Sequence, residues 1–120
     1  MTRRSGDRLL FLRRSAEIER VKKEGRRFQT SLFNLVSCPS RAPLAQSSRI
    51  AIVVGKRLGL AVERNRAKRL FRELSRQVRG GLVTGWDLVV FPRREVLTVT
   101  FQRLRDTWLS ALRHEGLLNS

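Results

Sequence analysis

The sequence is poor in the side chains that most often carry chemistry alone. Among 120 residues it has one cysteine, one histidine and no tyrosine. The single cysteine, Cys38, excludes an internal disulfide and fits a reducing compartment, so we expect a cytoplasmic protein. We interpret Cys38 as a small apolar strand residue and His114 as a cation near the last carbonyls of a helix. Two such isolated residues predict no protein-bound metal or cofactor.

Long apolar runs are also missing. No run approaches the roughly 20 residues of a membrane span, and Leu9–Leu12 is too short for a signal-peptide core. Gly55 and Gly59 flank a lysine, but without the spacing of a phosphate-cradling nucleotide loop. We therefore expect a binding protein with no catalytic residue of its own, no membrane partner and no small-molecule substrate.

Acidic residues are scarce relative to basic ones. The chain has 10 Asp and Glu against 26 Lys and Arg, a formal net charge of +16. Self-repulsion on this scale destabilises a compact fold unless an anionic partner screens it. Nucleic acid is the leading candidate, followed by an anionic membrane and then an acidic protein. Most of the cations are Arg, which suits bidentate phosphate contacts and stacking on bases.

The apolar pattern predicts one α+β domain over residues 15–116, with a basic, flexible arm at 1–14 and a short tail at 117–120. The expected order of elements is helix, three strands, helix, strand and helix. This order is typical of a two-layer α/β sandwich built on one sheet. The run 49–54 suggests a central strand buried on both faces, and the strand–helix–strand unit should be parallel with the usual right-handed crossover. The expected helices are 16–24 after the N-cap Ser15, 61–79, and 99–114 after the N-cap Thr98; the expected strands are 26–29, 32–38, 49–54 and 86–91.

The second expected helix has two different faces. Ala67, Leu70, Phe71, Leu74 and Val78 fall within one arc and predict a core stripe. Like charges four residues apart repel, so the opposite stripe destabilises the helix unless phosphate lies against it. An RNA or DNA backbone is therefore favoured over a solvated face, whereas a helix lying on a membrane would need a broader apolar face. That cationic stripe consists of Asn65, Arg69, Arg72 and Arg76, with Lys68 and Arg79 beside it.

The stretch 56–73, reading KRLGLAVERNRAKRLFRE, resembles the signature of the protein subunit of bacterial ribonuclease P. The short helix ending at Gly25, the apolar strand before the signature and the later WDLVVFPR agree with that family, so the resemblance covers roughly residues 10–114. The matching positions are Lys56–Arg57, Gly59, Ala61–Val62, Arg64–Asn65–Arg66, Lys68–Arg69 and Arg72–Glu73.

The resemblance implies an α/β sandwich, related to a ribosomal-protein domain, whose strand–helix–strand crossover is left-handed. It implies a holoenzyme that removes the 5′ leader from precursor transfer RNA with Mg²⁺ held by its catalytic RNA, while the protein performs no bond chemistry. The protein would bind both the catalytic RNA and precursor tRNA. Docking on the catalytic RNA would use Lys56, Arg57, Arg64, Asn65, Arg66, Lys68, Arg69, Arg72 and Arg76.

The resemblance also implies a cleft between the first helix and the sheet that holds the single-stranded leader. Family members line this cleft with aromatic residues, whereas this chain offers fewer, so we expect leader binding to depend more on cations and aliphatic contact. The expected cleft residues are Ile18, Lys22, Arg26, Arg27, Phe33 and Val36. For Phe33 a plain core position is an equal alternative.

Two other functions fit parts of the pattern. A ribosomal or other structural RNA-binding protein would share the charge and the Arg-rich helix but would have no role in tRNA processing. A DNA-binding regulator would present its recognition helix after a short turn from another helix. Here the basic helix follows a strand, which argues against the regulator.

Overall fold

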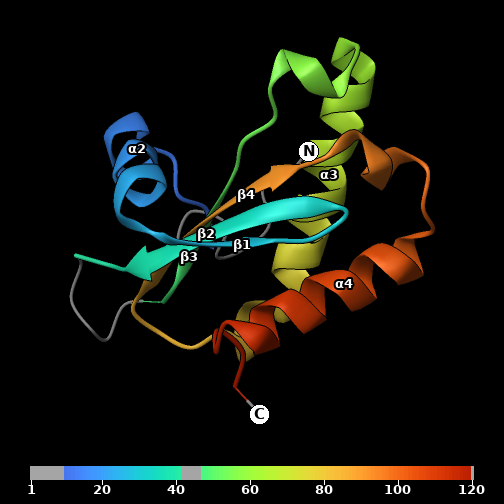
Figure 1. The fold of residues 1–120 in the computed structure, drawn as a ribbon. Helices are drawn as coiled ribbons and strands as arrows, with labels where there is room; N and C mark the ends of the chain where they lie inside the picture. The colour runs from blue at the N-terminus through green and yellow to red at the C-terminus, as the bar shows by residue number, and fades with distance from the viewer. Residues whose placement is uncertain (1–9, 42–46, 120) are drawn as a thin grey trace, which may run out of the picture.

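The computed structural model describes residues 10–41 and 47–119. A four-stranded sheet in the order β1-β2-β4-β3 is flanked by three helices (Figure 1). The elements are α2 (Ser15–Glu24), β1 (Arg26–Gln29), β2 (Phe33–Pro39), β3 (Arg49–Ile52), η1 (Lys56–Leu58), α3 (Ala61–Val78), η2 (Arg79–Gly81), β4 (Trp86–Pro92), η3 (Arg94–Leu97) and α4 (Phe101–His114).

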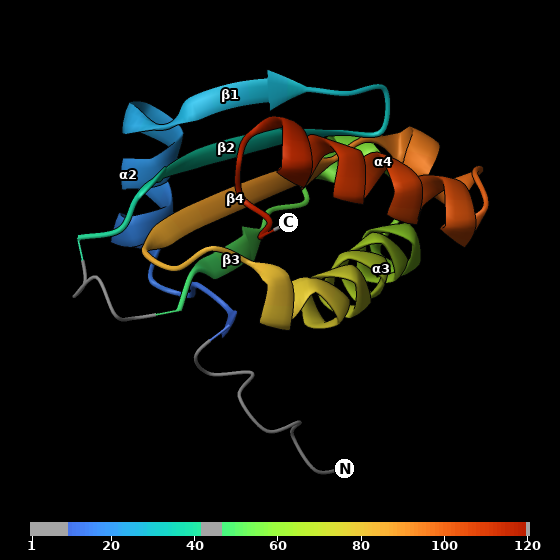
Figure 2. The same cartoon turned by 90° about the horizontal axis from the view of Figure 1, so that it is seen from below.

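The topology confirms the predicted α+β fold. β1 pairs with β2 and β2 with β4 in antiparallel register, while β3 pairs with β4 in parallel. The β3–α3–β4 crossover is left-handed (Figures 1 and 2). The general right-handed rule therefore gives the wrong hand here, and the hand implied by the family resemblance is correct.

β3 lies at the edge of the sheet, so its predicted central position is wrong. β2 and β4 are the strands with partners on both sides. The apolar run 50–54 is tolerated at an edge because residues 10–12 cover β3 there. The Leu12 N–H donates to the Ile50 carbonyl over 2.8 Å, and Leu10 and Leu12 are buried. Residues 1–9 of the predicted arm lie outside the described residues. The predicted boundary at residue 14 is too late, because 10–12 are packed.

The two sheet faces build two separate cores. On one face α3 and α4 (Figure 2) cover the larger core, where Phe33, Phe71 and Trp108 meet edge to face with ring centroids 5.5–5.7 Å apart. On the other face α2 covers a smaller core that contains Val21, Val36 and the buried Cys38. Because α2 is short, part of this second face stays uncovered.

The helix ends differ slightly from prediction. Ser15 is the first residue of α2 rather than its N-cap. The N-cap of α4 is Thr100, whose hydroxyl accepts a hydrogen bond from the Arg103 N–H over 3.1 Å, and not Thr98. Residues 117–119 of the expected tail are packed beyond α4, because Leu117 is buried and the Asn119 N–H donates to the Gly81 carbonyl. In the described part of the chain, no helix is long and apolar enough to cross a membrane.

Candidate nucleic-acid interface

The predicted two-faced character of α3 is confirmed. Ala67, Phe71, Leu74 and Val78 are buried in the larger core. Within residues 10–41 and 47–119, the exposed side chains of Asn65, Arg66, Arg69 and Arg72 have no hydrogen-bond or ion-pair partner. Arg76 is half-buried and lies 3.9 Å from Glu73. α3 therefore presents a cationic face that is available to an anion.

The start of α3 is held by a charged clamp that the sequence did not reveal. The Arg94 guanidinium makes a bidentate pair with the Glu63 carboxylate, at 3.1 and 3.0 Å, and also donates to the Leu58 carbonyl over 2.6 Å. Glu63 accepts a third bond from the Leu60 N–H, and Arg64 donates to the Gly59 carbonyl. Part of the Arg64 side chain is therefore committed to the helix start, while the following cations project outward.

Replacing Glu63 by glutamine should remove an acid-sensitive part of the stability. The Arg94 hydrogen bonds, and then the Leu60 N–H, hold the pKa of Glu63 below its ordinary value. A depressed folded pKa stabilises the fold above the unfolded pKa of about 4.3, and this stabilisation is lost as pH falls through the folded value. Thermal melting should separate wild type from Glu63→Gln near neutral pH, with the gap narrowing in acid. Glu95→Gln, an exposed control beside Arg94, should give no such gap, and a gap independent of pH would contradict the assignment.

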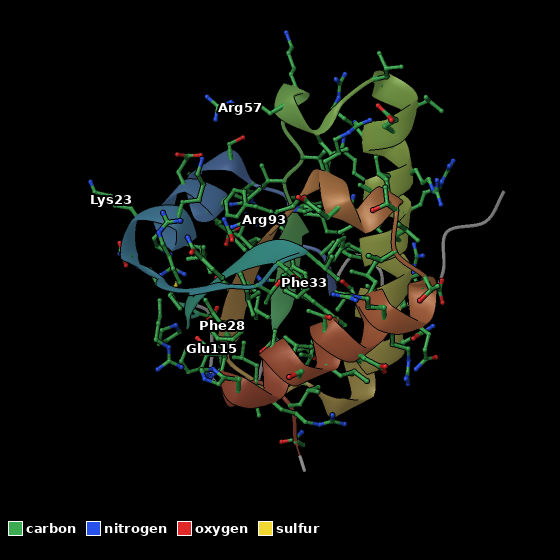
Figure 3. The ribbon with its side chains drawn as sticks, turned by 45° about the vertical axis from the view of Figure 1, so that its right-hand side comes forward. Lys23, Phe28, Phe33, Arg57, Arg93 and Glu115 are labelled. Carbon is green, nitrogen blue, oxygen red and sulfur yellow. The ribbon has the colours of Figure 1, made fainter. Side chains whose placement is uncertain are left out.

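The uncovered part of the α2 face forms a cleft of about 470 Å³, which we call the α2 cleft. Its floor is Phe91 of β4 and Val53, and its rim carries cations from three elements. Arg57 of η1 and Lys22 of α2 both line this cleft, and Figure 3 shows Arg57 reaching out from η1 on the side of the molecule where α2 lies. The lining residues are Lys22, Arg27, Asn34, Val53, Gly55, Arg57, Leu58, Phe91 and Pro92.

Two predicted cleft residues lie on the wrong face of the sheet. Phe33 is 0% exposed and packs against Phe71 and Trp108 beneath α3 and α4, away from Arg57 in Figure 3. Arg26 also points to the α4 side, where its Nε donates to Glu115 over 3.0 Å. Side chains alternate across a strand, so Arg27 and Asn34, each one position further along its strand, line the cleft instead.

The other predicted cleft residues lie on the correct face of the sheet, but two of them are buried or half-buried. Val36 is 0% exposed beneath α2, so it supports the cleft floor without lining it. Ile18 is half-buried in the same small core. Lys22 does line the cleft, and its ammonium lies 3.1 Å from Glu19.

Phe91 is the cleft residue that sequence reasoning missed. It is half-buried, pairs in register with Asn34 and offers the only aromatic ring among the described cleft-lining residues. The alternation along β4 contained the signal, because Asp87, Val89 and Phe91 must share one face. The direction of that face becomes evident only once α2 is placed.

A buried aspartate joins α2 to the sheet. Asp87 in β4 is 1% exposed and accepts hydrogen bonds from Arg20 of α2 at 3.0 Å and from Arg49 of β3 at 3.3 and 3.4 Å. Arg49 also donates to Glu17 over 2.8 Å. These ion pairs join α2 to β3 and β4. They hold α2 against the sheet, and α2 forms one wall of the α2 cleft.

No group of three His, Cys, Asp or Glu side chains lies close enough to hold a metal ion in the described ranges 10–41 and 47–119. His114, the single histidine, stacks on Phe28 with centroids 4.3 Å apart, and its Nδ1 is 2.9 Å from the Glu115 carboxylate. Together with Arg26, these residues join β1 to the end of α4 (Figure 3 labels Phe28 and Glu115).

Comparison with known proteins agrees with this geometry. The family model for ribonuclease P matches residues 7–115. The chain belongs to the ribonuclease P protein family. The ribonuclease P protein component of Chloroflexus aggregans is 37% identical over 110 residues, which are 91% of this chain and 79% of that protein. The component from Dehalococcoides mccartyi is 40% identical over 88 residues, 73% of this chain and 69% of that protein.

Solved ribonuclease P proteins share the fold. The protein from Thermotoga maritima superposes with a TM-score of 0.76 at 31% identity, covering 87% of this chain and 96% of that one. A Staphylococcus aureus ribonuclease P protein reaches 0.79 at 24% identity, covering 90% and 96%, and supports the fold alone. As a ribonuclease P protein component, the chain is an RNA-binding subunit of a tRNA-processing endoribonuclease.

Proposed function

We propose that this protein docks on the catalytic RNA of ribonuclease P through α3 and holds the 5′ leader of precursor tRNA in the α2 cleft. The observation that carries the proposal is the pair of separate cationic surfaces. Arg66, Arg69 and Arg72 project from α3 without acidic partners in the described structure, while Lys22, Arg27 and Arg57 surround the Phe91 floor. One surface suits a folded RNA backbone and the other a single strand.

The division of labour follows from the chemistry of each surface. The α3 face carries guanidinium groups that bind phosphates bidentately. The α2 cleft adds an aromatic ring on which an unpaired base can stack. In this proposal the protein contributes binding and positioning, and the Mg²⁺ ions that assist cleavage belong to the RNA. The buried Cys38 fits the proposed cytoplasmic location.

Reconstitution tests the proposal. The protein is mixed with a bacterial ribonuclease P RNA and precursor tRNA at low Mg²⁺, and release of the 5′ leader is followed over time. Addition of the protein should increase the cleavage rate. RNA binding without any gain in cleavage would instead indicate a structural RNA-binding protein.

Phe91→Ala should reduce the preference for substrate that carries a leader. Loss of one stacking contact should lower the affinity for long-leader precursor by about 5- to 150-fold, since stacking contributes ~1–3 kcal/mol per base. Affinity for leaderless tRNA should stay unchanged. The measurement is equilibrium binding of both substrates to the reconstituted holoenzyme.

Two further phenylalanines serve as controls for Phe91→Ala. Phe101→Ala, at an exposed position on α4, should leave the leader preference intact. Phe33→Ala should instead lower the free energy of unfolding by ~3–5 kcal/mol, because it opens a cavity among Phe71 and Trp108. An equal loss of leader preference in Phe91→Ala and Phe101→Ala would contradict the proposal that the leader binds in the α2 cleft.

A further inference from the structure

A second hollow lies at the β3 edge of the sheet, with lining residues different from those of the α2 cleft. This β3-edge pocket has a volume of about 490 Å³ and lies between the N-terminal segment, β3 and α3. Phe11 and Arg13 come from the segment, Ile52 from β3, and Arg72 and Arg76 from α3. None of these residues lines the α2 cleft.

The pocket offers a fixed stacking surface. Phe11 bridges to Ile50, and the Leu12 N–H donates to the Ile50 carbonyl, so the backbone beneath the ring is tied to the sheet. The Arg76 guanidinium lies over the Phe11 ring, 5.8 Å from its centroid, so the ring and the guanidinium form this surface together. Aromatic rings and guanidinium planes are the two groups on which proteins stack unpaired bases.

The pocket also offers backbone hydrogen bonds. The Val53 N–H donates to the Val90 carbonyl in β4 over 3.0 Å. Because successive peptide groups of a strand point in opposite directions, the N–H and C=O of Ile52 are directed away from β4, toward the pocket. One donor and one acceptor on the same residue match the polar edge of a nucleobase.

Two exposed cations line the pocket. Arg13 and Arg72 are exposed, and across the described part of the chain neither has a hydrogen-bond or ion-pair partner. Their positions beside a stacking surface suit the phosphate that accompanies a base. An acidic peptide would satisfy these cations and its backbone would pair with Ile52, but its carboxylates would leave the stacking surface without a matching group.

We propose that the β3-edge pocket binds one unstacked nucleotide of the catalytic RNA, with its base against Phe11 and its phosphate at Arg13 and Arg72. The inference rests on the proposed function and adds a site to it. The occupant belongs to the catalytic RNA because the pocket shares Arg72 and Arg76 with the docking face of α3. The pocket would give the docking some dependence on base identity, which phosphate contacts alone lack.

Chemical probing of the RNA tests this pocket. Dimethyl sulfate reactivity of the catalytic RNA is compared without protein, with wild type, and with Phe11→Leu or Arg13→Gln. Wild type should protect one or two unpaired nucleotides that become reactive again with either variant, while the remaining protections persist. The affinity of Phe11→Leu for the RNA should fall about tenfold, in the range expected for one stacked base.

The controls separate the pocket from the docking face. Arg103→Gln on α4 makes the same charge change as Arg13→Gln and should keep the wild-type pattern, and thermal melting should show that Phe11→Leu remains folded. A wild-type protection pattern and wild-type affinity with both variants would overturn the pocket. If wild type itself protected no nucleotide and bound no RNA, the proposed function would fail first.

Discussion

Asp87→Asn should lower the free energy of unfolding by about 3 kcal/mol. The substitution leaves Arg20 and Arg49 without their shared carboxylate in a site where both side chains are less than one-fifth exposed. Removing one partner of a buried ion pair typically costs ~3–5 kcal/mol. The lower end of that range applies because Arg49 keeps Glu17 and Arg20 keeps Glu24, at 2.8 and 3.6 Å. Urea unfolding followed by circular dichroism measures the loss.

A rim carboxylate provides the matched control. Glu24→Gln removes the same charge from an ion pair whose Glu24 side chain is 47% exposed, and should change stability by less than ~0.5 kcal/mol. Equal destabilisation by the two substitutions would mean that Asp87 is no more important than a surface carboxylate. If Asp87→Asn destabilised α2 more than the rest of the chain, this would support the role of Asp87 in fixing the wall of the α2 cleft.

The triple substitution Arg66→Gln, Arg69→Gln and Arg72→Gln should weaken binding to the catalytic RNA by about 2,000-fold or more. Hydrogen bonds to charged groups contribute ~1.5 kcal/mol or more each, and three phosphate contacts would be lost. The slope of log affinity against log salt should fall by about 2–3, since each contact accounts for ~0.7–0.9. Filter binding over a salt series measures both quantities.

The control is another triple substitution with the same change in charge. Arg41, Arg103 and Arg113 are exposed and lie outside α3. Their replacement by glutamine should leave most of the affinity and most of the salt slope intact. If both triple variants lost affinity equally, the net charge of +16 would bind the RNA without a dedicated face.

α3 was predictable because a period of 3.6 residues separates its faces without help from the rest of the fold. The positions of Ala67, Phe71 and Leu74 alone determine where Arg69 and Arg72 point. The strands were harder to interpret. A shift of one residue exchanges the two faces of a strand, and β2 is apolar on both because α2 covers one face and α3 with α4 the other. The apolar pattern of β2 therefore does not correct the expectation that the family resemblance gives for Phe33, although Asn34 lies in the cleft.

Long-range pairs were also beyond the sequence. Asp87 breaks an apolar run, WDLVVF, and a buried carboxylate in such a run needs a cation. That signal was present, but nothing in the sequence selected Arg20 and Arg49 from so many arginines. Arg94 and Glu63 are likewise far apart in the chain and meet only because η3 lies against the start of α3. Local periodicity determines an element, whereas tertiary placement determines its partners.

The Arg94 clamp has a mechanical consequence. Arg94 holds the Leu58 carbonyl and the Glu63 carboxylate at once, so η1, which carries Arg57, is braced against the first turn of α3. Arg57 lines the α2 cleft, and Arg66 begins the exposed arginines one turn further along α3. If RNA binds as proposed, the distance between the leader and the catalytic RNA is set by this brace. The protein would then fix the spacing between the two bound RNAs. Removing the Arg94 hydrogen bonds should make cleavage occur at more than one position before it abolishes RNA binding.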